Sequence, residues 1–382
     1  MQYPASKLPS VGLTIFSQMS ALAVKHKAIN LSQGFPDFDG PEALLKAVDK
    51  YISSGANQYA PMAGLPLLRQ EIAAKIKRCY GREVDSECEV TVTSGATEAI
   101  FAAISAVVGV EDEVIVFDPA YDSYEPAITL NGAKTVHIPL LPPSFSIDWQ
   151  RVIDAIIPKT RMIIFNTPHN PTGTVMSEDD LKTLETIVEG TDIVLLSDEV
   201  YEHIVFDGLS HQSFNRYPAL AERSFIVSSF GKTYHVTGWK VGYCIAPAPL
   251  MAEFQKVHQY LTFSTATPLQ AAIAEFMQSE TLHDSELAGF YQQKRDFMNQ
   301  HLKGSRFSIN PSAGTYFQLL DYREISDLPD QAFVVWLLEN AGVATIPLSP
   351  FYADDQQTGF VRLCFAKGQS TLLQAGERLC AI

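Results

Sequence analysis

From about residue 88, short β-branched and apolar runs alternate with longer segments of helical pattern. The runs are short and β-branched, which favours strands over helices. We expect these strands at Glu89–Thr93, Glu113–Phe117, Met162–Phe165, Ile193–Leu196 and Phe225–Val227. A buried helix is expected at Ala96–Val108. Another begins after the N-cap Ser177, with Asp180 at its third position, and ends at Gly190. Strands that alternate with helices imply βαβ units, so the chain is predicted to form an α/β fold around a mostly parallel sheet.

The pattern changes after about residue 275, where a long amphipathic segment, Ser285–Lys303, precedes more widely separated strands. We expect those strands at Thr315–Leu320, Val343–Ile346 and Phe360–Phe365. A chain of 382 residues exceeds one typical domain. The prediction is a large domain over residues 40–275, and a smaller α+β domain formed by residues 1–39 together with 276–382.

The composition argues against several classes of partner. The formal net charge is −15 and the isoelectric point about 5.0, which disfavours nucleic acid and anionic membrane surfaces. The five cysteines are odd in number and have no CxxC spacing, which fits neither a disulfide framework nor a zinc site, so a reducing compartment is expected. No signal peptide and no apolar run of about 18 residues is recognised, so we expect a soluble cytoplasmic protein.

Polar or small residues follow all five predicted strands of the parallel region. Ligands of open parallel sheets bind at the carboxyl ends of strands, so these segments are expected to form one site. The segments are Ser94–Thr97, Asp118–Tyr121, Asn166–Gly173, Ser197–Tyr201 and Ser228–Lys232.

Each segment has an ordinary interpretation as well as a functional one. Gly95 and Ala96 at a helix start suit a phosphate, or are simply a helix cap; no GxGxxG dinucleotide fingerprint occurs. Asp198 follows an apolar run and needs a cation such as a protonated heterocyclic nitrogen, unless it is a surface residue. Tyr201 can donate a phenolic hydrogen bond, and Asn170 belongs either to a structural turn or to the rim that carries Asp198.

Two basic residues complete the set. Lys232 stands in Gly-Lys-Thr, but a phosphate-binding loop requires glycine at position 226, which is Ile226. Lys232 is therefore either a solvated lysine or a desolvated amine of lowered basicity that acts as a nucleophile. Arg362 lies in an apolar strand and either snorkels to solvent or binds a carboxylate. An amine, an acid for a pyridinium nitrogen and a phosphate site together match one cofactor, pyridoxal 5′-phosphate (PLP).

The sequence resembles the class I/II aminotransferases of PLP fold type I over nearly its whole length, from about Ile29 to Ala381. The most specific stretches are NTPHNPTG at 166–173, SDEVY at 197–201 and SSFGKTYHVTGWKVG at 228–242. The resemblance implies a large domain with helices on both faces of a mostly parallel sheet, and a smaller α+β domain. It also implies a homodimer with shared active sites and no metal.

The resemblance assigns a role to each candidate residue. Lys232 is the Schiff-base lysine and the base that moves the α-proton; Asp198 holds the pyridinium nitrogen. Tyr201 and Asn170 hydrogen-bond the phenolic oxygen of the ring, and Tyr121 stacks on the ring. The phosphate is bound by Gly95, Ala96, Ser229 and Lys240, and by Tyr59 of the neighbouring subunit; Lys240 stands where many members have arginine. Arg362 clamps the substrate α-carboxylate, with Gly34 and Asn170 near the same group.

Within the family, LSQGFPDF, QYAP, FDPAYDSY and KVHQYLTFS are similar to the branch with methionine and kynurenine/glutamine-type aminotransferases. That similarity implies ping-pong transfer of the amino group of methionine or aromatic-type amino acids to a 2-oxo acid. Ile15, Phe16, Tyr59 and Tyr121 are candidates for the side-chain pocket, and no second arginine is apparent for a side-chain carboxylate. A PLP-dependent carbon–sulfur β-lyase remains the alternative. A non-catalytic regulator on the same fold is disfavoured because no basic stretch or room for a DNA-binding domain is seen before residue 30.

Overall fold

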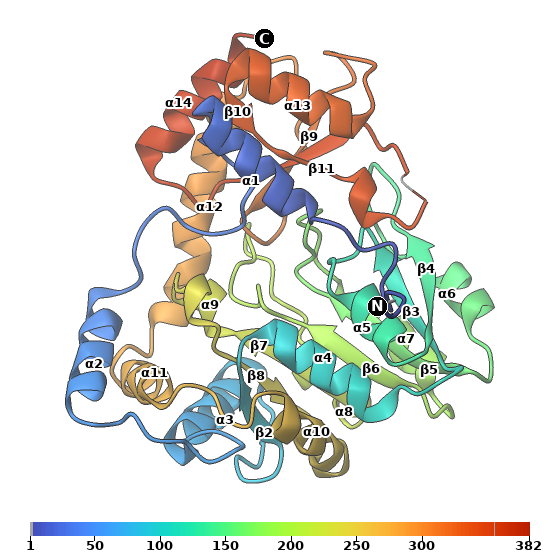
Figure 1. The fold of residues 1–382 in the computed structure, drawn as a ribbon, viewed down its shortest axis with the longest axis vertical. Coiled ribbons are helices and arrows are strands. Elements are labelled where there is room, and N and C mark those ends of the chain that lie inside the picture. Colours follow the sequence, from blue (N-terminus) through green and yellow to red (C-terminus); the bar gives the residue numbers. More distant parts are fainter. Residues whose placement is uncertain (1–2, 355) are drawn as a thin grey trace.

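The computed structural model describes residues 3–354 and 356–382, and a seven-stranded sheet forms the centre of its larger part (Figure 1). Its strand order is β2-β8-β7-β6-β5-β3-β4. The strands are β2 (Val90–Thr93), β3 (Glu113–Asp118), β4 (Lys134–Pro139), β5 (Thr160–Asn166), β6 (Val194–Asp198), β7 (Ser224–Ser229) and β8 (Gly242–Ile245). The strand β8 runs antiparallel to both β2 and β7, and the pairs from β7 to β4 are parallel. The predicted mostly parallel α/β sheet is confirmed.

Helices cover both faces of this sheet because successive strand residues point to opposite sides. In β3, Ile115 packs into one apolar cluster while Val114 and Val116 pack into the other. The first face carries α2 (Glu42–Ser53), α3 (Pro66–Tyr80), α6 (Trp149–Ala155), α7 (Glu178–Val188), α8 (Pro218–Ala221) and α11 (Thr267–Ser279). The second carries α4 (Ala96–Val107), α5 (Tyr124–Leu130) and α10 (Ala248–Leu261). Helices therefore shield both faces of the sheet from water, as is usual for a parallel sheet.

The five predicted strands of this region are all present, with ends shifted by up to two residues, and two further strands were not foreseen. These are β4 at one edge of the sheet and the antiparallel β8. Ser177 caps α7 in a capping box with Asp180, as expected. The last helical residue is Val188 and Glu189 is the C-cap, so the predicted stop residue Gly190, with φ +71°, comes directly after the cap.

A second group of elements lies at the other end of the molecule, at the top of Figure 1. It holds a three-stranded antiparallel sheet of β11 (Ile346–Pro347), β12 (Phe360–Cys364) and β9 (Phe317–Asp321). Beside it, β1 (Ile29–Asn30) pairs in parallel with β10 (Val343–Ala344). The helices of this group are α1 (Ile15–His26), α12 (His283–His301), α13 (Asp330–Ala341) and α14 (Gln369–Cys380).

The expectation of one strand over Val343–Ile346 is wrong. That stretch forms two short strands that belong to different sheets, β10 and β11. The pairing of β1 with β10 brings an N-terminal segment to the C-terminal part of the chain, in line with the predicted joining of residues 1–39 with 276–382. The domain boundaries themselves stay a prediction. No helix within the described ranges is long and apolar enough to cross a membrane.

The ends of the strands meet at one edge of the large sheet. Gly242 of β8 pairs with Thr93 of β2 on one side and with Ser229 of β7 on the other. Asn166 at the end of β5 pairs with Asp198 at the end of β6. The polar segments that follow β2, β5, β6 and β7 are consequently level with one another. The short helix α9 (Phe230–Thr233) begins at this edge and carries Lys232.

Candidate active site

A cavity of about 280 Å³ opens at this edge of the sheet, and it gathers residues from distant parts of the sequence. All but one of the predicted site residues line it: Gly34, Gly95, Ala96, Tyr121, Asn170, Asp198, Tyr201, Ser229, Lys232, Lys240 and Arg362. Phe317 and Phe16 complete its wall next to Arg362. The cavity therefore lies between the large sheet and the second group of elements.

Lys232 projects its amine into the cavity. Burial lowers the pKa of Lys232 to about 8, and the neighbouring cations Lys240 and Arg362 act in the same direction. Its Nζ donates hydrogen bonds to Tyr316 Oη at 2.9 Å and to the Gly34 carbonyl at 3.2 Å. An amine with this pKa is neutral in an appreciable fraction of molecules near pH 7–8, so it can act as a nucleophile or a base.

Asp198 is the last residue of β6, and its carboxylate is buried at the floor of the cavity. Tyr124 Oη donates to its Oδ2 at 2.7 Å, and the backbone N–H of Val200 donates to Oδ1 at 3.4 Å. Burial nevertheless raises the pKa of Asp198 to about 6, because these contacts only partly replace water. The carboxylate is thus suited to a cationic N–H that enters the cavity. Sequence reasoning missed Tyr124, whose only signal was its place three residues after Tyr121.

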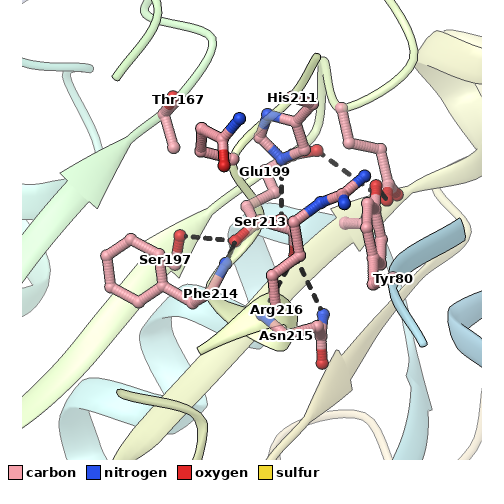
Figure 2. A network of polar contacts seen from close by, with 12 residues as sticks. Tyr80, Thr167, Ser197, Glu199, His211, Ser213, Phe214, Asn215 and Arg216 are labelled. Carbon is pink, nitrogen blue, oxygen red and sulfur yellow. Dashed lines mark hydrogen bonds and ion pairs between the residues drawn. The ribbon is translucent and has the colours of Figure 1, made fainter. Parts of the chain in front are cut away.

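A buried network fixes the backbone that carries Asp198 (Figure 2). Glu199 follows Asp198 directly, and its carboxylate accepts hydrogen bonds from Ser197 Oγ at 2.8 Å and from the Phe214 N–H at 3.0 Å. Its second oxygen lies 2.9 Å from His211 Nε2. Glu199 is held in this network and does not line the cavity, whereas the preceding residue, Asp198, does.

A second buried network lies a few residues further along the chain. Glu202 is ion-paired with Lys75 of α3, and both side chains are less than 5% exposed. Tyr243 Oη and Ser228 Oγ donate to Glu202 at 3.0 and 2.6 Å. The lysine lowers the pKa of Glu202 against the opposing effect of burial. These bonds join α3 to the strand ends β7 and β8 behind the cavity.

The wall near α4 has the features of an anion site. Gly95 caps α4 with φ +83° and contributes no side chain, so the first N–H groups of the helix face the cavity. Gly242 must lack a side chain here, because a Cβ would lie 2.8 Å from the Ser228 carbonyl and 2.9 Å from the Ala96 nitrogen. Lys240 reaches the same corner, and no residue of the described ranges forms a hydrogen bond or ion pair with its amine.

Arg362 of β12 forms the opposite wall and is only 1% exposed. Its guanidinium donates to Asn170 Oδ1 at 2.7 Å and to the Ser32 carbonyl at 2.8 Å, while Nε is buried without a partner in the described structure. The Phe317 ring lies 3.9 Å from the guanidinium carbon, and the Phe16 ring lies 5.2 Å from it. A charged group with an unused N–H is a site for a carboxylate.

The remaining predicted site residue, Tyr59, and one candidate for the side-chain pocket, Ile15, lie elsewhere. Tyr59 does not line the cavity: its side chain is 84% exposed, and its ring meets Phe263 edge-on at 5.4 Å. Ile15 packs with the core of the second group of elements, whereas its neighbour Phe16 faces the cavity. Asp122 lines the cavity and was not foreseen. No cluster of potential metal ligands occurs among residues 3–354 and 356–382.

The comparisons with known proteins agree with this geometry. The sequence pattern of the aminotransferase class I and II family matches residues 26–379. The chain belongs to this family. The predicted family and an aminotransferase activity are therefore confirmed, and such enzymes act on amino acids and 2-oxo acids.

Two relatives stand out among the matches of this aminotransferase. It is 54% identical to the methionine aminotransferase of Escherichia coli, over 98% of this chain and 97% of the relative. A solved structure from that organism, described as having a methionine aminotransferase function, superposes with a TM-score of 0.98 at 53% identity over the whole of both chains. A kynurenine–oxoglutarate transaminase of Dictyostelium discoideum is 34% identical over 98% of this chain and 95% of the relative.

Proposed function

We propose that this aminotransferase binds PLP and transfers the amino group of methionine or aromatic-type amino acids to a 2-oxo acid by a ping-pong reaction. The observation that carries the proposal is the meeting of Lys232, Asp198 and Arg362 on one cavity. The 54% identity to a methionine aminotransferase over nearly the whole chain supports the choice of substrate.

The residues present fit PLP at three points. Asp198 is a buried carboxylate that lacks a cationic partner in contact, which suits a protonated ring nitrogen. The N-terminus of α4, Ser229 and Lys240 form a corner suited to a phosphate. Lys232 offers an amine of lowered basicity to the aldehyde. When bound, PLP supplies an aldehyde carbon that exchanges amines and a ring that takes up the electrons of the α-carbon.

The side chains of this chain then have separate tasks. Arg362 binds the α-carboxylate through its unused N–H, and Asn170 and the Ser32 carbonyl keep the guanidinium in place. Lys232 in its neutral form accepts the α-proton at Nζ and returns it later. Tyr201, Asn170 and Tyr121 line the cavity; the first two would hydrogen-bond the phenolic oxygen, and Tyr121 would stack on the ring.

The charges of the cavity favour a substrate with an uncharged side chain. Its basic residues are Lys232, Lys240 and Arg362, and the first two are assigned to the aldehyde and the phosphate. Only Arg362 remains for a carboxylate. Asp122 adds negative charge, and its electrostatic influence extends to Arg362. A second carboxylate on the substrate would therefore lack a cation and meet an anion.

A homodimer with shared sites and a cytoplasmic location form part of the same proposal. Tyr59 is 84% exposed, and Phe263, whose ring contacts that of Tyr59, also presents apolar surface to solvent. Such a surface suits a second copy of the chain, whose Tyr59 would reach the phosphate. The cysteines, including the buried Cys244 and Cys364, are unpaired, which is typical of a reducing compartment.

The test is a panel of amino donors measured against two or three 2-oxo acids. We expect methionine and aromatic amino acids to give the highest kcat/KM, and Lys232→Ala to abolish turnover. Full turnover by Lys232→Ala excludes the proposal. Release of pyruvate and ammonia from cystathionine, without an added oxo acid, would instead favour the carbon–sulfur β-lyase.

A further inference from the structure

The hydroxyl of Tyr316 contacts the amine of Lys232, although sequence reasoning gave this tyrosine no role. Lys232 Nζ donates to Tyr316 Oη at 2.9 Å and to the Gly34 carbonyl at 3.2 Å. Tyr316 Oη itself donates to the same Gly34 carbonyl. The three groups close a triangle, in which the hydroxyl donates to the Gly34 carbonyl and accepts from Lys232; the hydroxyl also interacts with the side chain of Tyr201.

Packing fixes the hydroxyl at this place. Tyr316 is fully buried, and its carbonyl accepts from the Phe365 N–H at 3.0 Å. Its ring meets Tyr201 at 5.2 Å and Phe317 at 4.9 Å, both edge-on. A side chain enclosed in this way has little rotational freedom, so the acceptor is in position before the amine arrives.

Once the substrate amine has displaced Lys232 from the cofactor, the free lysine amine needs a hydrogen-bond acceptor that holds it in place. When the substrate amine forms its bond to the cofactor carbon, the bond from that carbon to Lys232 breaks and leaves a free amine with four rotatable bonds. That amine must then take the α-proton. The entropy of a free lysine side chain opposes any single productive geometry.

We propose that Tyr316 and the Gly34 carbonyl form the dock that receives the Lys232 amine each time the substrate displaces it. The amine takes the α-proton and becomes an ammonium, and the ammonium donates to Tyr316 Oη and to the Gly34 carbonyl. Tyr316 is thus a positioning residue, because it acts on the reaction through Lys232. This inference rests on the proposed PLP-dependent transamination.

The other groups around Lys232 do not supply this contact. The charged or titratable neighbours that act on its amine are Cys364, Lys240, Arg362 and Asp198, and the rings of Tyr201 and Tyr316 lie 5.5 and 5.4 Å from it. Two of these groups are cations, and neither Asp198 nor Cys364 is hydrogen-bonded to the amine. Loss of the Tyr316 hydroxyl therefore leaves one acceptor, the Gly34 carbonyl, for the ammonium.

Two tyrosine-to-phenylalanine variants distinguish a role of the Tyr316 hydroxyl in holding the Lys232 amine from a role of its ring in packing. Tyr316→Phe removes the hydroxyl and keeps the ring. Tyr291→Phe is the matched control, because Tyr291 is also fully buried, its ring lies 5.6 Å from that of Tyr316, and its hydroxyl bonds His235 Nδ1 instead. A purely structural role predicts the same small effects in both.

The first measurement uses the full chain without cofactor. Trace acetylation with acetic anhydride across pH 6–11, with mass-spectrometric quantification of the Lys232 peptide, gives the titration midpoint of its amine. We expect the midpoint to fall by about one pKa unit in Tyr316→Phe, because an acceptor of the charged form is lost. Tyr291→Phe should match the unmodified protein.

The second measurement follows the cofactor absorbance of the PLP-loaded protein after rapid mixing with methionine. Tyr316→Phe should slow the half-reaction about tenfold at unchanged half-saturation, with a larger isotope effect for α-deuterated methionine. A Lys232 midpoint and a half-reaction rate equal to those of Tyr291→Phe would overturn the inference. If the unmodified protein shows no absorbance change with any amino acid, the proposed function fails, while the acetylation result still decides whether Tyr316 holds the amine.

Discussion

Replacement of Asp198 by asparagine removes a buried charge that the ligand-free protein stabilises poorly. Folding raises the pKa of this carboxyl from 3.8 to about 6, mainly because it is buried. At 1.36 kcal/mol per pKa unit, the ionised carboxylate costs about 3 kcal/mol of folded-state stability. The asparagine side chain would keep an oxygen that accepts from Tyr124, so Asp198→Asn should stabilise the ligand-free protein by up to about 3 kcal/mol at pH 7.

The stability gain of Asp198→Asn should depend on pH, and the direction of the pKa shift decides at which pH the gain is largest. Since the folded-state pKa lies above the unfolded one, the folded protein binds the extra proton between pH 3.8 and about 6. The penalty of the carboxylate is absent below this interval, grows through it and is complete above pH 6. The advantage of Asp198→Asn should therefore be large at pH 7 and shrink steadily toward pH 4.

Urea unfolding at pH 7, 6, 5 and 4.5, followed by circular dichroism at one protein concentration, measures this advantage. Asp192→Asn is the control, because Asp192 is exposed just before the same strand and makes no hydrogen bond or ion pair within the described structure. In the presence of PLP the order should reverse, because asparagine offers no charge to a ring cation. A variant that is no more stable than the parent at pH 7, or whose advantage is independent of pH, refutes the assignment of Asp198 as a strained buried anion.

Three further outcomes follow from the contacts described. Arg362→Lys should raise the KM for methionine about a hundredfold in steady-state assays, because lysine lacks the fork that the α-carboxylate needs; an unchanged KM would place the carboxylate elsewhere. Asp122→Asn should raise kcat/KM for aspartate about fivefold relative to methionine, since an anion is removed from the cavity; a constant ratio contradicts this. Glu202→Gln should lower the free energy of unfolding by about 3–5 kcal/mol, because Lys75 keeps a buried charge. The exposed Glu83→Gln is its control, and equal unfolding midpoints for these two variants would argue against the buried pair.

The sequence predicted the site better than its surroundings, for a physical reason. Asp198 and Lys232 follow strands directly, and the ends of parallel strands meet at one edge, so local patterns placed them together. Tyr124 and Tyr316 act through hydroxyls whose partners are 74 and 84 residues away in sequence, and no local pattern carries that information.

The misplaced elements have similar causes. Neighbouring helix residues diverge by about 100°, so the choice between Ile15 and Phe16 for the cavity depends on the rotation of α1 against its neighbours. The strands β10 and β11 contain two residues each, too few for a period to show. The strand β8 has only four residues and begins with Gly242, a residue that is depleted in strands, so its sequence gives little strand signal.

The parallel pairing of Ile29 with Val343 constrains the order in which parts of the protein can fold during synthesis. These partners are more than 300 residues apart, and the Leu31 carbonyl further accepts from the Cys364 N–H at 2.9 Å. On a ribosome, Ile29 and Asn30 cannot pair until more than 300 further residues have been made. All seven strands of the central sheet have left the exit tunnel long before then, so that sheet can assemble during translation. Arg362 lies on β12, so it reaches the cavity only after the segments that carry Asp198 and Lys232 have been made.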